Sequence, residues 1–207
     1  MGNRGRFGKY GEHKRIAKLR DVRTRPGSPP KGGLESPRLT ERYKKKTSQK
    51  TPRIKIRPAA ASDVDYVGVL SKKAFQQYGP YENILPHWLE SGITFTFIAL
   101  MEERPVGFAM IGRPAQKWNF PGMCELLAVA VEPANQRLGI GDLLMREVER
   151  TANEQEVEKV ILHTATKNLP GQKLFNKHGF ISLEIKKNFY PEGQDALMMY
   201  KDIIQRN

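Results

Sequence analysis

The sequence contains little cysteine and no long hydrophobic run. Cys124 is the only cysteine among 207 residues, which excludes an intramolecular disulfide and gives no sign of an oxidising compartment. No stretch approaches the roughly 18 consecutive apolar residues of a membrane-spanning helix, and the first residues lack the apolar segment of a signal peptide. We therefore expect a soluble, cytoplasmic protein without a transmembrane segment.

Acidic residues are scarce in the first quarter of the chain. Residues 1–50 hold 16 Lys and Arg but only 4 Asp and Glu, whereas the rest of the chain is nearly balanced, with 19 and 18. Because this segment is also rich in Gly, Pro and Ser, we predict a basic, disordered tail at 1–50 and one folded domain at 51–207. The charge indicates contact with RNA or the ribosome, and a solvated extension is the alternative. No feature of the sequence indicates an oligomeric state.

Residues 51–207 alternate between strand-like and helix-like hydrophobic patterns. The expected order is a strand, two helices, three strands, a helix, a strand, a helix and two strands, which corresponds to a mixed α/β sheet. The nearly continuous apolar run Cys124–Val131 predicts a central strand buried on both faces. Ser62, with Asp65 three positions later, predicts a capping box at the start of the first helix. His178 is explained by capping at a helix C-terminus.

Two glycines, Gly139 and Gly141, lie where the apolar strand gives way to a helix. Backbone N–H groups point outward at a helix N-terminus, the helix dipole favours negative charge there, and glycine lets phosphate oxygens approach. The third glycine of a dinucleotide fingerprint and the Gly-Lys-Ser/Thr of a P-loop are both missing. The pattern therefore indicates an anion site of another kind, with an ordinary tight turn as the alternative.

Two motifs resemble those of the GNAT superfamily of acetyl-CoA-dependent N-acetyltransferases. The segment QRLGIG, Gln136–Gly141, is similar to the superfamily's Q/R-x-x-G-x-G/A loop. Its N-x-x-A-x-x-L-Y-x-x-x-G-F helix motif is approximated by Asn168, Gly171, Leu174, Phe175, Gly179 and Phe180. The resemblance covers roughly residues 53–203 and implies a GNAT-type acyltransferase fold with splayed central strands.

The same resemblance implies acetyl-CoA as a cosubstrate and no metal. Backbone N–H groups of the glycine loop would hold the pyrophosphate, the preceding strand would run beside the pantetheine arm, and the asparagine before the next helix would hold that arm. The implied cofactor-binding residues are Val129, Ala130, Val131, Gln136, Arg137, Leu138, Gly139, Ile140, Gly141, Asp142, Asn168 and Phe175.

Two residues are candidates for the general base that takes a proton from the acceptor amine. Glu125 lies inside the apolar strand, where a carboxylate is costly unless it is paired or used; its spacing matches the strand glutamate of histone-type members. His163 lies where protein N-terminal acetyltransferases of the superfamily carry a catalytic Glu or His, and imidazole suits neutral pH. Both could act together through an ordered water. A salt-bridged carboxylate and a packed histidine are the alternatives.

Phe175 occupies the position of the superfamily's usual general acid, a tyrosine. A phenylalanine ring can pack against the thioester but cannot donate a proton to the leaving thiolate. The thiolate would then leave unaided, or it would take a proton from water or from another hydroxyl group. A protein that binds acetyl-CoA with little activity is a further alternative.

The last predicted hairpin gives information on which amine accepts the acetyl group. The segment NFYPEGQDALMMY, Asn188–Tyr200, resembles the hairpin of ribosomal-protein-alanine N-acetyltransferases (RimI type), whose tyrosine-rich loop covers the acceptor peptide. The resemblance implies substrate binding by Tyr190, with Tyr78 and Tyr81 on the opposite wall and loop packing as the alternative. We predict acetyl transfer to a protein N-terminal α-amine. Transfer to lysine or to a small molecule such as a polyamine, and an acetyl-CoA-binding module associated with RNA, are the alternatives.

Overall fold

The computed structural model describes residues 53–112 and 122–203. The predicted basic tail, residues 1–50, lies outside the described residues. The strands are β1 (Ile54–Pro58), β2 (Thr94–Met101), β3 (Arg104–Gly112), β4 (Met123–Val131), β5 (Lys159–Ala165), β6 (Ile181–Lys186) and β7 (Ala196–Asp202). The α-helices are α2 (Val64–Phe75), α3 (Tyr81–Glu90), α4 (Ile140–Glu154) and α5 (Leu169–Lys177). Their order along the chain confirms the predicted alternation of strands and helices. Within these ranges, no helix combines the length and apolar character needed to cross a bilayer.

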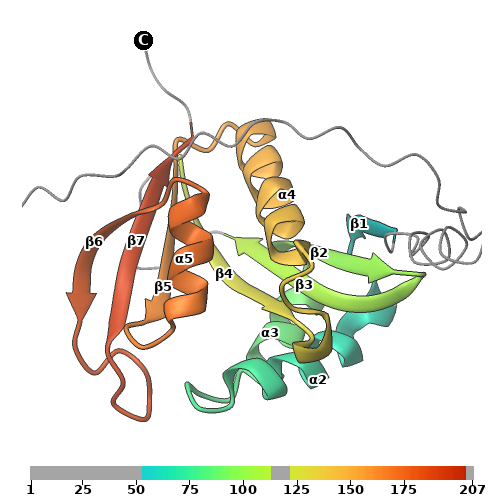
Figure 1. The fold of residues 1–207 in the computed structure, drawn as a ribbon, viewed down its shortest axis with the longest axis horizontal. Helices are drawn as coiled ribbons and strands as arrows, with labels where there is room; N and C mark the ends of the chain where they lie inside the picture. Colours follow the sequence, from blue (N-terminus) through green and yellow to red (C-terminus); the bar gives the residue numbers. More distant parts are fainter. Residues whose placement is uncertain (1–52, 113–121, 204–207) are drawn as a thin grey trace, which may run out of the picture. The chain divides into compact units, whose positions relative to one another are not determined.

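The described strands form one mixed sheet in the order β1-β2-β3-β4-β5-β7-β6 (Figure 1). Neighbouring strands run antiparallel, except that β4 and β5 run parallel. These two strands pair only from Met123 and Lys159 to Leu126 and Leu162, although both continue further. Their separation beyond Leu126 and Leu162 confirms the predicted splayed central strands and opens the middle of the sheet.

A β-bulge in β4 changes which side chains face each side of the sheet. Opposite β3, Met110 pairs with Ala128 and Ile111 pairs with Leu126, so Leu127 is the extra residue. Buried and half-buried residues alternate along β4. The prediction of a strand buried on both faces is confirmed in part. Cys124 and Leu126 belong to one hydrophobic cluster and Ala128 and Ala130 to another, while the alternate residues between them are half-buried.

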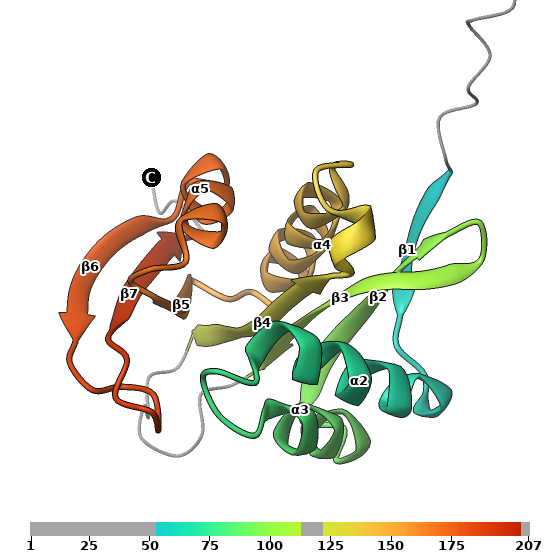
Figure 2. The same cartoon turned by 60° about the horizontal axis from the view of Figure 1, so that its bottom comes forward.

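Two layers of helices cover the sheet. Helices α4 and α5 lie on one face, and α2 and α3 lie on the other (Figure 2). Buried residues of α4 join Phe175 and Phe180 in one hydrophobic cluster, while Val67, Leu70 and Leu85 of α2 and α3 belong to a second. Burial of these apolar side chains is the main force that holds the helices to the sheet.

The 3₁₀ turn Ala61–Asp63, which precedes α2, is stabilised by the Asp63 side chain rather than by Ser62. The Asp63 carboxylate accepts hydrogen bonds from Arg57 Nη1 (2.6 Å) and Nη2 (2.8 Å) and from the Ala60 backbone N–H (2.7 Å). Asp63 is buried and Ser62 is exposed. The predicted capping box of Ser62 and Asp65 is therefore wrong, because residues 61–63 form this turn and the N-cap residue of α2 is Asp63, which makes no side-chain cap to α2.

Candidate functional site

The turn before α4 has a backbone suited to an anion. Gly139 is the N-cap residue of α4 with a φ of 80°, in the left-handed region, and Arg137 has a φ of 63°. No side-chain cap satisfies the first N–H groups of the helix among the described residues, so these donors are open to a ligand. A Cβ at Gly139 would have no atom within 4 Å, whereas one at Gly141 would lie 3.2 Å from Leu174 Cδ2. Glycine therefore keeps space open at the first position and lets α5 approach at the second.

This turn lines a pocket of about 570 Å³, which we call the α4 pocket. Its walls come from the second half of α2, the end of β4, the turn before α4 and the starts of α4 and α5. The predicted cofactor-binding residues that line it are Val129, Ala130, Val131, Gln136, Arg137, Gly139, Ile140, Gly141, Asp142 and Asn168. A pocket of this size, with free N–H groups at a helix start, suits a large anionic ligand.

Leu138 and Phe175 are not among the residues that line the α4 pocket. The Leu138 side chain is exposed, whereas Phe175 is buried with 8% of its surface exposed. The Phe175 ring meets Phe180 edge-on, with 6.2 Å between ring centroids. Its neighbour Leu174 lines the pocket instead. The structure thus places the Phe175 ring in the hydrophobic core rather than in the wall of the pocket.

Asn168 is the N-cap residue of α5, and both ends of its side chain are used within the protein. Its Oδ1 accepts a hydrogen bond from the Gly171 N–H (3.1 Å), and its Nδ2 donates one to Thr164 Oγ1 (3.0 Å). These bonds hold the start of α5 against β5. The amide therefore has a structural role as a cap, and it also contributes to the pocket wall.

Glu125 and His163 are brought together where β4 and β5 separate. Glu125 Oε1 lies 2.8 Å from His163 Nδ1, and 19% of the glutamate side chain and 9% of the histidine side chain are exposed. The two candidate bases are therefore in direct hydrogen-bond contact rather than on either side of an intervening molecule. A carboxylate can only accept, so Nδ1 carries the proton and Nε2 is the free basic nitrogen of a neutral ring.

The other ring nitrogen of His163, Nε2, is buried, and the imidazole stacks on an aromatic ring. Nε2 is buried and has no hydrogen-bond partner among the described residues. The ring of Phe189 stacks on the imidazole, with 4.5 Å between centroids and 14° between planes. A buried polar atom without a partner is uncommon and costly. The unprotonated Nε2 can accept a proton or a hydrogen bond from a ligand that binds beside it.

Two loops close over the same side of the sheet. The rings of Tyr78 and Tyr190 lie 4.9 Å apart, and Gln194 Nε2 donates a hydrogen bond to the Gln77 carbonyl (2.6 Å). Tyr81 packs against the same cluster. The structure therefore joins all three predicted tyrosines, and it connects the loop after α2 with the loop between β6 and β7.

The environment keeps the nearby hydroxyl and thiol groups neutral. Burial, followed by the charges of Tyr81, Tyr78 and Glu125, raises the pKa of Tyr190. Burial and then Glu125 raise the pKa of Tyr81. Burial, with Glu125 beside it, raises the pKa of Cys124 to about 12, so this thiol is not a nucleophile at neutral pH.

Sequence reasoning missed Phe189 and Gln194. The stacking of Phe189 on His163 depends on how the loop between β6 and β7 folds over β5. The link from Gln194 to Gln77 spans 117 positions of sequence, so no local pattern could have indicated it. Within the described ranges, His, Cys, Asp and Glu side chains form no group of three that could hold a metal ion.

Comparison with known sequences identifies related proteins. The profile of the acetyltransferase (GNAT) family matches residues 64–180. An N-alpha-acetyltransferase of Sulfurisphaera tokodaii is 28% identical over 162 residues, which cover 73% of this chain and 95% of the relative. The similarity thus extends over nearly the whole of that enzyme.

Comparison with solved structures gives the same fold. The ribosomal-protein-alanine N-acetyltransferase of Brucella melitensis superposes with a TM-score of 0.63 at 24% identity, covering 72% of this chain and 99% of that one. A Salmonella typhimurium protein solved with its cofactor acetyl-CoA superposes with a TM-score of 0.66 at 16% identity, covering 74% and 95%.

Proposed function

Because this chain belongs to the acetyltransferase (GNAT) family, we propose that it transfers the acetyl group of acetyl-CoA to the N-terminal α-amine of a protein. The resemblance found in the sequence is confirmed by the family match over residues 64–180. The protein is accordingly an acyltransferase, with acetyl-CoA as its cosubstrate.

The α4 pocket fits the cosubstrate. Its open N–H groups at the start of α4 and the space beside Gly139 suit a diphosphate. The half-buried residues Val129 and Val131 line the same pocket along β4, which suits an extended pantetheine arm. Acetyl-CoA bound there supplies the acetyl thioester; transfer forms an amide N–C bond and breaks the C–S bond.

The observation that carries the proposal is the hydrogen-bonded pair of Glu125 and His163. We assign the general base to His163, because Nδ1 is used by Glu125 and Nε2 is unpartnered. The Glu125 carboxylate holds the ring and its tautomer, and it stabilises the imidazolium that forms when Nε2 takes the proton of the acceptor amine. Glu125 is thus a positioning residue in this mechanism rather than a second base.

Two arguments favour an α-amine over a lysine amine. Relatives of 25–28% identity, which this chain matches over 92–96% of their length, are N-alpha-acetyltransferases. An α-amine has a reference pKa near 8, against about 10.4 for lysine, so less work is needed to remove its proton. The loop that carries Tyr190 also carries Phe189, which stacks on His163, and this supports placing the first residues of the acceptor beside Tyr78 and Tyr190.

Two finer proposals concern the setting of the reaction. We propose a cytoplasmic location, supported by the single cysteine of the chain. We also propose that residues 1–50 contact RNA or the ribosome, supported by their 16 Lys and Arg against 4 Asp and Glu. Removal of residues 1–50 would then abolish salt-dependent RNA binding without reducing turnover on a short peptide.

The proposal is tested by acetyl-CoA-dependent release of CoA with matched peptides. One peptide has a free α-amine and acetylated lysines, and its partner has an acetylated α-amine and free lysines. Turnover on the first peptide alone supports the proposal. Turnover only on the second, or only on a polyamine, contradicts the α-amine assignment. Binding of acetyl-CoA with no turnover on any acceptor would favour a binding module. Phe175 is consistent with that outcome, because it cannot donate a proton to the leaving thiolate.

A further inference from the structure

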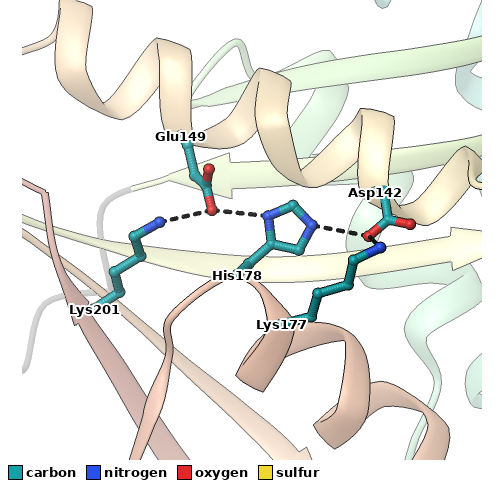
Figure 3. A network of polar contacts seen from close by, with 5 residues as sticks. All are labelled: Asp142, Glu149, Lys177, His178 and Lys201. Atoms are coloured by element: carbon teal, nitrogen blue, oxygen red, sulfur yellow. Dashed lines mark hydrogen bonds and ion pairs between the residues drawn. The ribbon is translucent and has the colours of Figure 1, made fainter.

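A network of five charged side chains connects α4 with the end of α5 and with β7 (Figure 3). Its members are Asp142, Glu149, Lys177, His178 and Lys201, and we call it the α4–α5 network. The ring of His178 lies at its centre, with 9% of the side chain exposed. Together with Arg146, these side chains line a surface pocket of about 410 Å³.

Both ring nitrogens of His178 face carboxylates of α4. Nδ1 lies 3.0 Å from Glu149 Oε1, and Nε2 lies 3.2 Å from Asp142 Oδ1. Both contacts are hydrogen bonds only when both nitrogens carry a proton, since a neutral imidazole has a single N–H. Lys201 Nζ lies 2.9 Å from the same Glu149 oxygen. His178 therefore does more than end α5, which is all that its place in the sequence had indicated.

Asp142 is the member that also belongs to the α4 pocket. It is the third residue of α4, a position from which a carboxylate commonly reaches back to the free N–H groups of its own helix. Here Oδ1 instead accepts from Lys177 Nζ (2.8 Å) and from His178. The hydrogen bond from Lys177, with a smaller contribution from His178, lowers the pKa of the Asp142 carboxyl despite the opposing effect of burial. This group is therefore anionic at neutral pH.

An anionic side chain at this place would oppose acetyl-CoA in two ways. It could occupy the N–H groups that a diphosphate needs, and its charge would repel the phosphates. Both effects are avoided while Lys177 and His178 hold the carboxylate toward α5 and the Lys177 ammonium offsets its charge. On α4 itself, Arg146 lies one helical turn after Asp142 and lines the same surface pocket, but the Asp142 carboxylate contacts Lys177 and His178 of the α5 end.

We propose that His178 and Lys177 are positioning residues for acetyl-CoA, acting by holding the Asp142 carboxylate away from the phosphate-binding start of α4. This proposal rests on the proposed function, since it takes acetyl-CoA as the ligand of the α4 pocket. His178 and Lys177 contact the cosubstrate only through Asp142, so they set its affinity and not the chemical step.

The first experiment compares two conservative variants of the full-length protein, His178→Gln and His178→Asn. The amide nitrogen of glutamine lies near the position of Nε2 and can donate to Asp142, whereas that of asparagine lies near Nδ1 and can donate only to Glu149. Calorimetry with acetyl-CoA should give a Kd close to the unmodified protein for His178→Gln and about fivefold weaker for His178→Asn. KM for acetyl-CoA should follow Kd, while kcat at saturating acetyl-CoA stays within about twofold.

The second experiment uses Lys177→Ala, because the exposed Lys177 can be removed without unfolding the protein. Its matched control is Lys173→Ala, an exposed lysine one helical turn earlier on α5. Lys177→Ala should weaken acetyl-CoA binding about threefold and Lys173→Ala less. In an Asp142→Asn background the effect of Lys177→Ala should vanish, since no carboxylate is left to hold.

The outcomes separate this proposal from the proposed function. If the unmodified protein does not bind acetyl-CoA, the proposed function fails. If it binds but His178→Gln and His178→Asn have equal Kd values, or the effect of Lys177→Ala persists beside Asp142→Asn, the positioning role is contradicted. A fall in melting temperature with unchanged Kd would likewise overturn it, because it would show a purely structural network.

Discussion

The α4 pocket and the Glu125–His163 pair are assembled from different parts of the chain. The end of the pocket that we propose for the phosphates consists mainly of backbone N–H groups and glycines within six consecutive residues, Gln136–Gly141. The pair consists of two side chains from neighbouring strands, 38 positions apart in sequence. A site made of local backbone can be recognised from a short sequence motif. A site made of side chains on two strands depends on how the strands pair and where they separate.

The same contrast predicts how substitutions should act. Damage to the backbone site should reduce affinity for acetyl-CoA and leave the chemical step intact. Damage to the side-chain site should reduce the chemical step and leave the affinity for acetyl-CoA intact. The substitutions below test this separation, beginning with the largest expected effect.

Removal of the proposed base should have the largest effect on turnover. We expect His163→Ala to lower kcat by about 10²- to 10⁴-fold, the usual contribution of general base catalysis. Glu125→Gln should lower kcat less, because the amide can still contact Nδ1 but no longer stabilises the imidazolium. Kd for acetyl-CoA should be unchanged in both, as measured by calorimetry. A larger loss with Glu125→Gln than with His163→Ala would make Glu125 the base and reverse the roles assigned to the pair.

Substitution of Gly139 should have the next largest effect, and on affinity alone. Gly139→Ala places a Cβ in the open space of the pocket and strains a residue with a φ of 80°, so we expect Kd for acetyl-CoA to rise about tenfold. Gly92→Ala is a matched control, because Gly92 has a φ of 68° and equally open space but does not line the pocket. Both variants should lose about 1 kcal/mol of stability in urea unfolding. Equal Kd values for the two would refute a phosphate site at Gly139.

The fold and the pocket could be predicted from sequence because their signals are local. Hydrophobic periodicity gave the order of strands and helices, and the turn at Gly139 followed from the type and spacing of its residues. Glu125 and His163 were both identified, but as rivals, because their contact is fixed by the register that aligns Leu126 with Leu162. The bulge at Leu127 and the ion pair between Asp63 and Arg57 were missed for the same reason.

Phe189 should have an intermediate effect confined to the chemical step. Its ring stacks on His163, so Phe189→Ala should let water reach Nε2 and allow the ring to turn. We expect a loss of about two- to tenfold in kcat, the range of a single aromatic contact. Phe189→Tyr should restore the rate by restoring the ring. Phe95→Ala is the control for loss of an exposed phenylalanine, since 49% of Phe95 is exposed against 41% of Phe189. If both alanine variants were equally impaired, the stacking would not matter.

The smallest effect on activity, with a measurable effect on stability, is expected at Asp63. Helix α2 serves both sites, because Leu70 and Lys73 line the α4 pocket and the loop after Phe75 carries Tyr78. Loss of the Asp63–Arg57 pair should therefore reduce the stability of the fold that supports both sites without favouring either. For Asp63→Asn we expect about 1 kcal/mol of destabilisation at pH 7, a low value for a charged hydrogen bond because 38% of the Arg57 side chain is exposed.

The pH dependence of that loss has a definite sign. The hydrogen bond from Arg57 lowers the pKa of the Asp63 carboxyl in the folded protein, so its stabilising contribution is complete above the unfolded pKa of about 3.9 and is lost as the pH falls below it. The difference in urea midpoint between the unmodified protein and Asp63→Asn should then stay constant down to about pH 4 and shrink at lower pH. Asp65→Asn, an exposed change in the first turn of α2, should cost less at pH 7. If Asp63→Asn changed kcat or Kd more than its stability loss explains, α2 would be part of one site rather than a common support for both.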